Sequence, residues 1–514
     1  MKMNIVKYPA SGSFPKAKVT KGSSFPTENP AIHIFGNRFY HDQTIYEYLI
    51  EFLLIFASAK DENQHEKFSF HTSDPTYYYV EPRVAFRRFV FLEKAKKSGR
   101  LPEDYNAYQN LKAMLYEKIE ATTETEKETF LLALQDLFYG YAAVLKKRSW
   151  CAQGLLPLCP EMICCEQLPN EVERKKVVKA MESGEKSLVD FDTSFDLTHH
   201  DFLARGGEMY YLHLLQILEH DSSKRQQLES LLTHLLCSKS QQLSSIANWV
   251  QTTWEENNNF DSSKMVKRMH IGCIPNGAYI SSGTSAVDEL LNFLSNELHP
   301  VKRVDLLAKG MMFQIMRMIS ERTAESLNAP VIPWIIDMRA TKGNDTIKKI
   351  ATQNFAQVYD QITDTINTHN NLLNSAATPD KRYSLCSDAK KDSCDIFKGK
   401  GKELLCIIPS NGANERFSLS EDILRFLVLS IIKPGQKMDL NMFLEELYAH
   451  FHLVIGPNEY KKTIKTDSLD PELINSFHHN KDAFQQFLKA TGFLRDLSDA
   501  TSIVENPYRE VSLP

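Results

Sequence analysis

Residues 44–59, TIYEYLIEFLLIFASA, contain the longest apolar stretch of the chain and are apolar on nearly every side of a helix. A helix of this kind is buried, either in the core of a large protein or in a membrane. Its apolar run, residues 48–59, is interrupted by Glu51 and is shorter than the roughly 20 residues that a membrane-spanning helix needs. The segment therefore predicts a buried helix inside a protein core, and no membrane partner is expected.

The chain of 514 residues is long enough for several domains of roughly 150 residues each. Hydrophobic residues make up 42 % and charged residues 24 %, which is ordinary for globular proteins and excludes a mainly disordered or collagen-like chain. The net charge of −5 excludes a protein that wraps nucleic acid with a surface that is basic overall, although it allows a local basic patch.

Nine cysteines, an odd number and a low one for this length, do not indicate a disulfide framework. The first eighteen residues, MKMNIVKYPASGSFPKAK, lack the apolar core of a signal peptide. We therefore expect a protein of the reducing cytoplasm.

Apolar residues recur with helical periodicity along most of the chain. Helices are predicted at 84–98, 105–118, 125–147, 171–183, 207–220, 223–237, 241–255, 285–298, 301–327 and 346–373. Short strands are predicted at 32–35, 331–338 and 403–409, and a mobile, lysine-rich loop at 374–402. The expected fold is mainly α, with multi-helical N-terminal and central regions and few short strands.

The C-terminal tail has the clearest pattern. Ser420 and Glu421 open a helix over 422–432, which Pro434 and Gly435 stop. Further helices are predicted at 438–451 and 481–491, followed by a strand, a turn and a strand within 494–506. Three helices followed by a hairpin is the order of a winged helix, so we expect a C-terminal winged-helix-like domain.

These patterns divide the chain into four expected domains. They are an N-terminal helical domain with a basic helix (1–150), a helical middle domain (151–260), an α-rich domain with a few strands (261–410) and the winged-helix-like domain (411–514).

A basic stretch within 83–100 is the most suggestive candidate site. It contains seven cations and a single acid, Glu93. The cations are Arg83, Arg87, Arg88, Lys94, Lys96, Lys97 and Arg100. Three tyrosines at 77–79 precede it and could stack on bases. We predict contacts with nucleic acid here, since lysines and arginines neutralise phosphates. A solvated helix face, or a docking surface for an acidic partner, is the alternative interpretation.

The tail has the opposite charge. Residues 411–514 hold 11 Lys and Arg against 15 Asp and Glu, a net charge of −4. A winged helix that reads DNA usually needs a positive recognition face. Protein contact is therefore the favoured role of the tail.

No motif identifies a reaction, a metal or a cofactor. The cysteines at 151, 159, 164 and 165 lack the paired spacing of a zinc clip, and the KGKGK segment at 398–402 lacks the frame of a phosphate-binding loop. A metal-dependent nuclease is the alternative, and it would require acids and histidines that are scattered along the sequence to meet in one pocket. The candidates for that alternative are Asp190, Asp192, Asp196, His199, His200, Asp201, Glu208 and Asp337.

Several short phrases in the tail carry a resemblance. They are Glu415-Arg416-Phe417, Leu424-Arg425-Phe426-Leu427-Val428, Pro434-Gly435, Ile455-Gly456-Pro457 and Leu497-Ser498-Asp499. With these phrases the tail resembles the C-terminal segment of accessory proteins encoded in bacterial multi-gene anti-phage defence or DNA-restriction clusters. The resemblance covers roughly a fifth of the chain and transfers no catalytic residue. It implies a non-catalytic partner of an ATPase, a nuclease or a methyltransferase.

We therefore expect a non-catalytic scaffold or adaptor subunit of a bacterial anti-phage defence complex. Its expected partners are the other subunits of that complex and, through the basic stretch, DNA. A metal-dependent nuclease and a DNA-binding transcriptional regulator are the alternatives. The regulator would need a basic recognition helix in the tail, which the charge of the tail disfavours.

Overall fold

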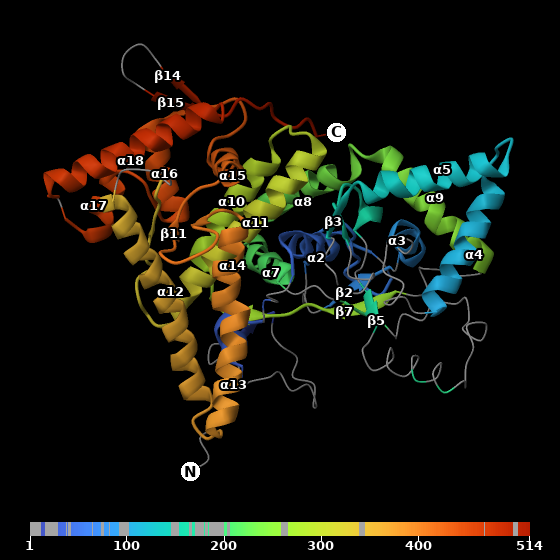
Figure 1. Cartoon of the computed structure of the whole chain (residues 1–514), viewed down its shortest axis with the longest axis horizontal. Helices are drawn as coiled ribbons and strands as arrows, with labels where there is room; N and C mark the ends of the chain where they lie inside the picture. Colours follow the sequence, from blue (N-terminus) through green and yellow to red (C-terminus); the bar gives the residue numbers. More distant parts are fainter. Residues whose placement is uncertain are drawn as a thin grey trace.

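The computed structural model in Figure 1 shows a mainly helical protein, as predicted, with most helices packed around a large hydrophobic core. A smaller second cluster joins Ile335, Ile347, Ala351, Val454 and Phe477. The structure describes residues 12–15, 29–37, 39, 43–63, 65–72, 77–81, 83–91, 102–144, 154–163, 167–169, 179, 183, 200–202, 206–258, 266–338, 345–466, 468–496 and 502–513. Among these residues, no helix has the length and apolar character needed to cross a membrane.

The helices of the first half are α1 (Pro30–Phe35), α2 (Ile45–Ala57), α3 (Val84–Phe91), α4 (Pro102–Lys118), α5 (Glu124–Tyr139), α7 (Gly207–Leu218), α8 (Ser222–Cys237) and α9 (Gln241–Asn258). Those of the second half are α10 (Ile280–Leu294), α11 (Pro300–Ser326), α12 (Asp345–Leu373), α13 (Pro379–Lys390), α14 (Ile396–Glu403), α15 (Glu421–Ile431), α16 (Leu440–Phe451), α17 (Pro457–Ile464) and α18 (Pro471–Ala490).

The strands are short and pair two or three at a time. They are β1 (Ser13–Phe14), β2 (Tyr77–Val80), β3 (Ala142–Val144), β4 (Gly154–Leu155), β5 (Gln167–Pro169), β6 (His200–Phe202), β7 (Lys267–His270), β8 (Ile274–Pro275), β9 (Trp334–Ile335), β10 (Ile407–Ile408), β11 (Arg416–Phe417), β12 (Lys437–Asp439), β13 (Leu453–Val454), β14 (Leu494–Asp496) and β15 (Ser502–Glu505).

Helix α2 is the buried helix that the apolar segment predicts. Glu51, the acid that interrupts this segment, is buried too, because it faces the start of α7. Its Oε2 accepts hydrogen bonds from the backbone N–H groups of Gly207 at 2.7 Å and of Glu208 at 3.2 Å. A carboxylate is stabilised at a helix N-terminus, where these groups have no partner within the helix.

Helix α11 runs through the central core, and helices α2, α12 and α15 pack against it. The absence of a side chain at Gly310 lets α15 come close, because a Cβ atom there would lie 2.2 Å from the ring of Phe426. Helix α15 belongs to the C-terminal module (residues 411–513), so the module is packed directly onto the core of the central region.

A junction of short strands joins the module to the region before it. Strand β13 pairs in parallel with β9, and β10 pairs with β11 in antiparallel. Trp334 of β9 stacks flat on Phe417 of β11, with ring centroids 4.6 Å apart. The expected domain boundary after residue 410 thus falls between two strands, β10 and β11, that pair with each other.

The C-terminal module follows the predicted order of elements. Strands β12, β15 and β14 form a three-stranded sheet in that spatial order, and α15, α16 and α18 come between or before them in sequence. Strands β11, β12 and β13 and helix α17 are additional elements, and α18 begins ten residues earlier than predicted, at Pro471. The assignment of this module as a winged helix stays a prediction.

Three segments differ from their predicted structure. Residues 142–144, predicted to continue the helix over 125–147, form strand β3, because α5 ends at Tyr139 and is followed by the C-cap Gly140. Most of the helix predicted at 171–183 lies outside the described residues. Residues 32–35 lie in helix α1 rather than a strand, because Asn29 caps the helix and Pro30 occupies its first position. The loop predicted at 374–402 is largely helical: α13, a π-helical segment (Lys391–Asp395) and α14 follow one another without a break.

Candidate functional site

The basic stretch lies partly in helix α3. Phe86, Phe89 and Phe91 are buried, in agreement with the predicted core face. Arg87 and Arg88 are buried as well, with exposed fractions of 5 % and 1 %, because α4, α5 and α9 all pack against α3. Contrary to the expectation, these two arginines do not lie on a surface open to phosphates.

Of the remaining five cations of the stretch, the structure describes only Arg83. Arg83 is half-buried just before α3, and its Nη1 atom donates a hydrogen bond to Oδ1 of Asn248 at 2.8 Å. The other four cations lie outside the described residues, and their contact with nucleic acid stays a prediction. They are Lys94, Lys96, Lys97 and Arg100.

The described residues contain no group of three or more His, Cys, Asp or Glu side chains placed to hold a metal ion. Glu208 accepts a hydrogen bond from the backbone of Gly272 at 3.2 Å, and Asp337 accepts one from Nε of Arg416 at 2.6 Å. These two acids are buried and hold chain segments together. His200 and Asp201 lie in β6, while Asp190, Asp192, Asp196 and His199 lie outside the described residues.

Helices α12, α13 and α14, together with the π-helical segment, form a long antiparallel pair that we call the arm. In Figure 1 the arm runs downward from the body, with α12 and α13 side by side along it. Helix α12 forms because its apolar residues recur on one face, and those buried include Ile347, Ala351, Val358, Ile362 and Ile366.

The base of the arm is fixed to the body through aromatic contacts. The ring of Phe355 on α12 meets the edge of Phe417, with centroids 5.3 Å apart. Further along α12, Nδ1 of His369 lies 3.0 Å from Nδ1 of His33 on α1. Helix α1 therefore supports the arm. These contacts fix the position of α12 relative to the body.

A groove of about 550 Å³ follows the outer face of the arm. We call it the arm groove, and its lining residues are Asn367, Asn370, Pro379, Arg382, Tyr383, Cys386, Ser387, Lys390, Lys391 and Asp395. Three of them are cations and one is an acid. The framework of the groove is held by the amide of Asn370, which donates to the backbone oxygen of Arg382 at 3.1 Å.

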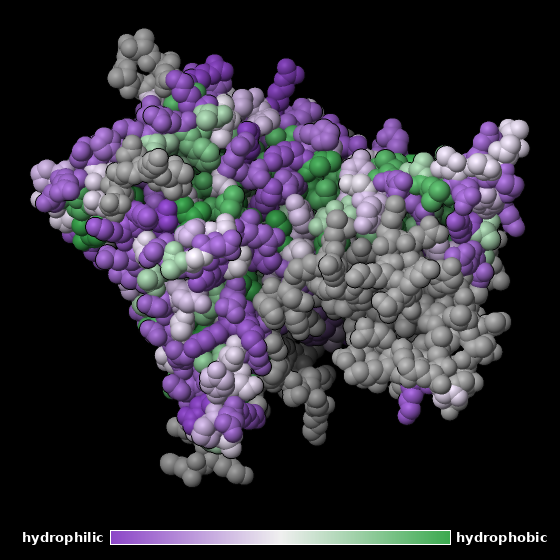
Figure 2. Space-filling view, viewed as in Figure 1, coloured by the Kyte–Doolittle hydropathy of each residue, from purple (hydrophilic) through white to green (hydrophobic). Residues whose placement is uncertain are grey.

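Two large side chains near the tip of the arm are unusually exposed. Tyr383 on α13 is 78 % exposed, and Leu372 in the last turn of α12 is 69 % exposed. The surface over the arm is otherwise mostly hydrophilic in the space-filling view (Figure 2). Aromatic and arginine side chains are enriched at protein interfaces. The groove therefore has the chemistry to bind an acidic segment that carries an apolar side chain.

The lysines of the KGKGK segment have a different environment from those of the arm groove. Nζ of Lys398 and Nζ of Lys402 lie 2.6 Å and 3.1 Å from Oε1 of Glu415. Although burial acts in the opposite direction, the hydrogen bonds from these lysines lower the pKa of Glu415 to about 2. The segment is helical and holds α14 against the start of the C-terminal module.

The C-terminal module is fixed to the body by two polar clusters. In the first, Asn480 of α18 donates to the backbone oxygens of Ile336 and Ile455, both at 2.9 Å, and accepts from the backbone of Met338. This places the middle of α18 against the junction strands. Only the opposite face of α18 is open to a partner, with Asn475, His478, Asp482, Gln486 and Lys489 exposed.

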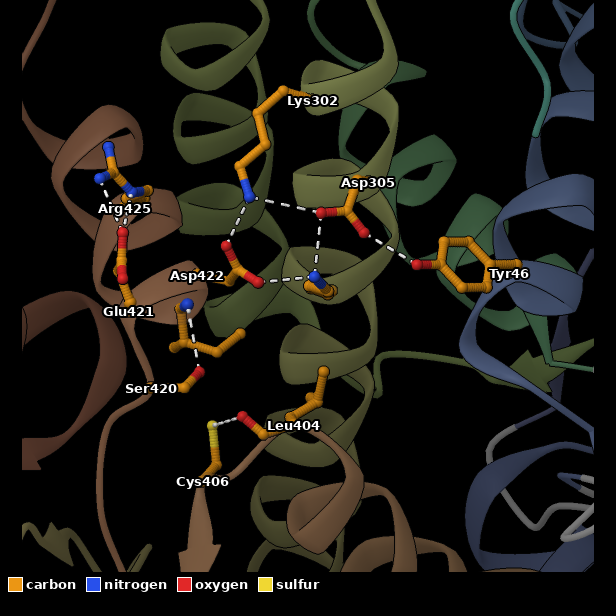
Figure 3. A network of polar contacts seen from close by, with 11 residues as sticks. Tyr46, Lys302, Asp305, Leu404, Cys406, Ser420, Glu421, Asp422 and Arg425 are labelled. Carbon is orange, nitrogen blue, oxygen red and sulfur yellow. Dashed lines mark hydrogen bonds and ion pairs between the residues drawn. The ribbon is translucent and has the colours of Figure 1, made fainter. Parts of the chain in front are cut away.

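The second cluster is shown in Figure 3. Asp422 of α15 accepts from Lys302 and from Lys309 on α11, each at 2.6 Å, and Asp305 accepts from Lys309 at 2.9 Å. Tyr46 of α2 donates to Asp305 at 2.8 Å. Alternating charges from α11 and α15, together with the hydroxyl of Tyr46 on α2, thus join the module, the central helix and the N-terminal region.

Comparisons were made with protein-family models, curated proteins and solved structures. None of them matches this chain. The function is therefore inferred from the arrangement of the residues of this chain.

The sequence interpretation missed the arm groove because residues 374–402 were expected to form a loop. Two signals point to a helix there: Thr378 and Pro379 match an N-cap followed by a proline at the first helical position. The groove residues of α13 also share one face, since 382, 383, 386, 387 and 390 follow a spacing of three to four.

Proposed function

We propose that this chain is a non-catalytic scaffold or adaptor subunit, and that its arm groove docks an acidic segment of a partner protein. The observation that carries the proposal is the combination of Arg382, Lys390 and Lys391 in one groove with the exposed Tyr383, which lines the same groove. The cations attract and orient an acidic partner, and the ring of Tyr383 supplies apolar area.

The identity of the partners is inferred from the tail. Its resemblance to accessory proteins of anti-phage defence clusters points to other subunits of such a complex, acting in the cytoplasm. The net charge of −4 over 411–514 favours a protein partner for this module as well. On this proposal the arm and the module are two docking elements on one rigid body.

The test is complex formation between the tagged full chain and the proteins encoded by neighbouring genes, co-expressed and then separated by size. Replacing Tyr383 by Ala is expected to weaken the complex by about 2 kcal/mol or more, as loss of an interface hot spot does. The matched control is Ile280→Ala, which truncates an apolar side chain of α10 that is 50 % exposed. A complex that survives the Tyr383 variant unchanged contradicts the docking role of the arm.

The scaffold function is tested separately by deletion of residues 411–514. We expect this deletion to release at least one partner that the arm variants retain. If the full chain forms no complex with any of the co-expressed proteins, the scaffold proposal is wrong.

DNA contact is a second candidate function, favoured by the order of helices and strands in the C-terminal module. Its test is a shift assay at low salt with the variant Lys96→Glu/Lys97→Glu and with the deletion of 411–514. If both variants still shift the DNA as the native chain does, neither region contributes to DNA binding.

A further inference from the structure

A second cavity, on the other side of the body, is not used by the docking proposal. This cleft of about 550 Å³ lies where the end of α2, strand β2 and the start of α9 meet. Its size is within the range of clefts that hold small molecules. Its apolar part is formed by Leu54, Val80, Ile163 and Leu236, all of them buried.

Arg83 lines this cleft and is held in place by a relay of hydrogen bonds. Its Nη1 atom donates to Oδ1 of Asn248 at 2.8 Å, and Nδ2 of Asn248 donates to Oε1 of Glu161 at 3.1 Å. Because the NH₂ group of Asn248 donates to Glu161, the amide is oriented so that its oxygen accepts from the guanidinium of Arg83. A guanidinium has five N–H donors, and the bond to Asn248 uses one of them.

Three other charged residues line the cleft, Lys67, Glu81 and Glu161. Lys67 forms an ion pair with Glu81. The bond from Arg83 goes to the neutral amide of Asn248, which in turn donates to Glu161. A side chain held in this way is already oriented before a ligand arrives, which reduces the entropy lost on binding.

Hydroxyl and aromatic groups complete the lining. Ser240 directly precedes α9, Ser244 and Ser245 lie near its start, and their hydroxyl groups are able to donate hydrogen bonds. The side chains of Phe68 and Tyr79 line the same cleft. The lining thus joins a charged, donor-rich part to an apolar and aromatic part.

We propose that this cleft binds a small organic anion, a carboxylate or phosphate ester on an apolar body. The anionic group would lie on Arg83 with the serine hydroxyls of α9, and the body would pack against Leu54, Ile163 and Leu236. Arg83, predicted from sequence to contact a nucleic-acid phosphate, is on this proposal a recognition residue for a small molecule.

The test uses 1-naphthyl phosphate as the probe, 1-naphthol as its neutral counterpart, and the full chain. Calorimetric titration is expected to show that the phosphate binds and that Arg83→Gln weakens binding by about 10- to 100-fold, as for a lost hydrogen bond to a charged group. The control is Arg495→Gln, since the Arg495 side chain is 72 % exposed in the C-terminal module. Equal binding of both probes, or equal binding by the Arg83 variant, overturns the proposal.

A second measurement needs no substitution. Cys237 lines the cleft and is an exposed free thiol, whereas Cys386 lines the arm groove. Because burial raises the pKa of the Cys237 thiol, labelling by a maleimide is followed at pH above 8 with peptide mass spectrometry. The phosphate is expected to slow labelling at Cys237 and 1-naphthol is not. Protection of Cys386 alone, or of neither thiol, contradicts binding in the cleft.

Discussion

The basic residues of helix α3 and those of helix α13 have opposite environments. On α3, Arg87 and Arg88 are buried under three other helices, whereas on α13 the cations face an open groove. The difference lies in the neighbours: α3 is covered by α4, α5 and α9, while α13 packs mainly against α12 and α1. A run of positive charge therefore indicates a binding surface only where the packing leaves one side of the helix uncovered.

The largest expected effect of this difference is on stability. Replacing Arg88 by Glu puts a carboxylate at a site that is 1 % exposed and leaves the groups around the guanidinium without their cation. Such a change at a buried charge costs about 3–5 kcal/mol. We expect the free energy of unfolding, measured with urea, to fall by that amount.

The control for this prediction is Lys433→Glu, a charge reversal at an exposed position of the C-terminal module. Surface substitutions of this kind usually change stability by less than about 0.5 kcal/mol. If Arg88→Glu were as mild as this control, Arg88 would be accessible, and the contrast between the two basic segments would be lost.

The elements predicted well from sequence are those whose residues determine them locally. Helix α11 has an uninterrupted period, and α15 is bounded by the cap at Ser420 and by Pro434 and Gly435. The hairpin of β14 and β15 was also predicted, as two short strands on either side of a turn at 499–500. In these cases the local pattern and the packing agree.

Features that depend on distant residues were not predictable. The burial of Arg88 depends on α9, more than 150 residues further along the chain, and Asp337 pairs with Arg416 of β11, which follows the arm. Asp337 was weighed as a nuclease ligand because sequence shows the acid but not its partner. The arm groove needs both α12 and α13, so neither segment alone reveals it.

A smaller effect is expected from pH, at the contact that braces the arm. Burial, with the nearby charges of His33 and Arg322, lowers the pKa of His369 from 6.5 to about 4, and burial also lowers the pKa of His33. The unfolded chain therefore binds more protons than the folded chain between these two pH values. The stability that the neutral pair contributes is complete above pH 6.5 and is lost as the pH falls toward 4.

The measurement is urea unfolding at pH 7.5 and at pH 5, for the native chain and for the variant His33→Phe/His369→Phe. Other groups titrate over this interval in both proteins, so the comparison isolates the histidine pair. We expect the native chain to lose more stability than the variant between the two pH values. An equal loss in both would show that the pair is protonated as easily in the fold as in the unfolded chain.

The smallest expected effect is that of Lys391→Ala on the fold itself. Nζ of Lys391 lies 3.5 Å from Asp388, and both side chains are about half exposed, at 51 % and 46 %. A surface pair of this kind contributes between about 0 and 1 kcal/mol, so the free energy of unfolding is expected to change by no more than that. The same variant is expected to weaken binding of an acidic partner to the arm groove, and more strongly at low salt than at high salt. A loss of stability comparable to that of Arg88→Glu would mean that the cations of the arm support the fold, as those of α3 do. A small loss together with weaker, salt-dependent binding is the result that separates the two basic segments by role as well as by burial.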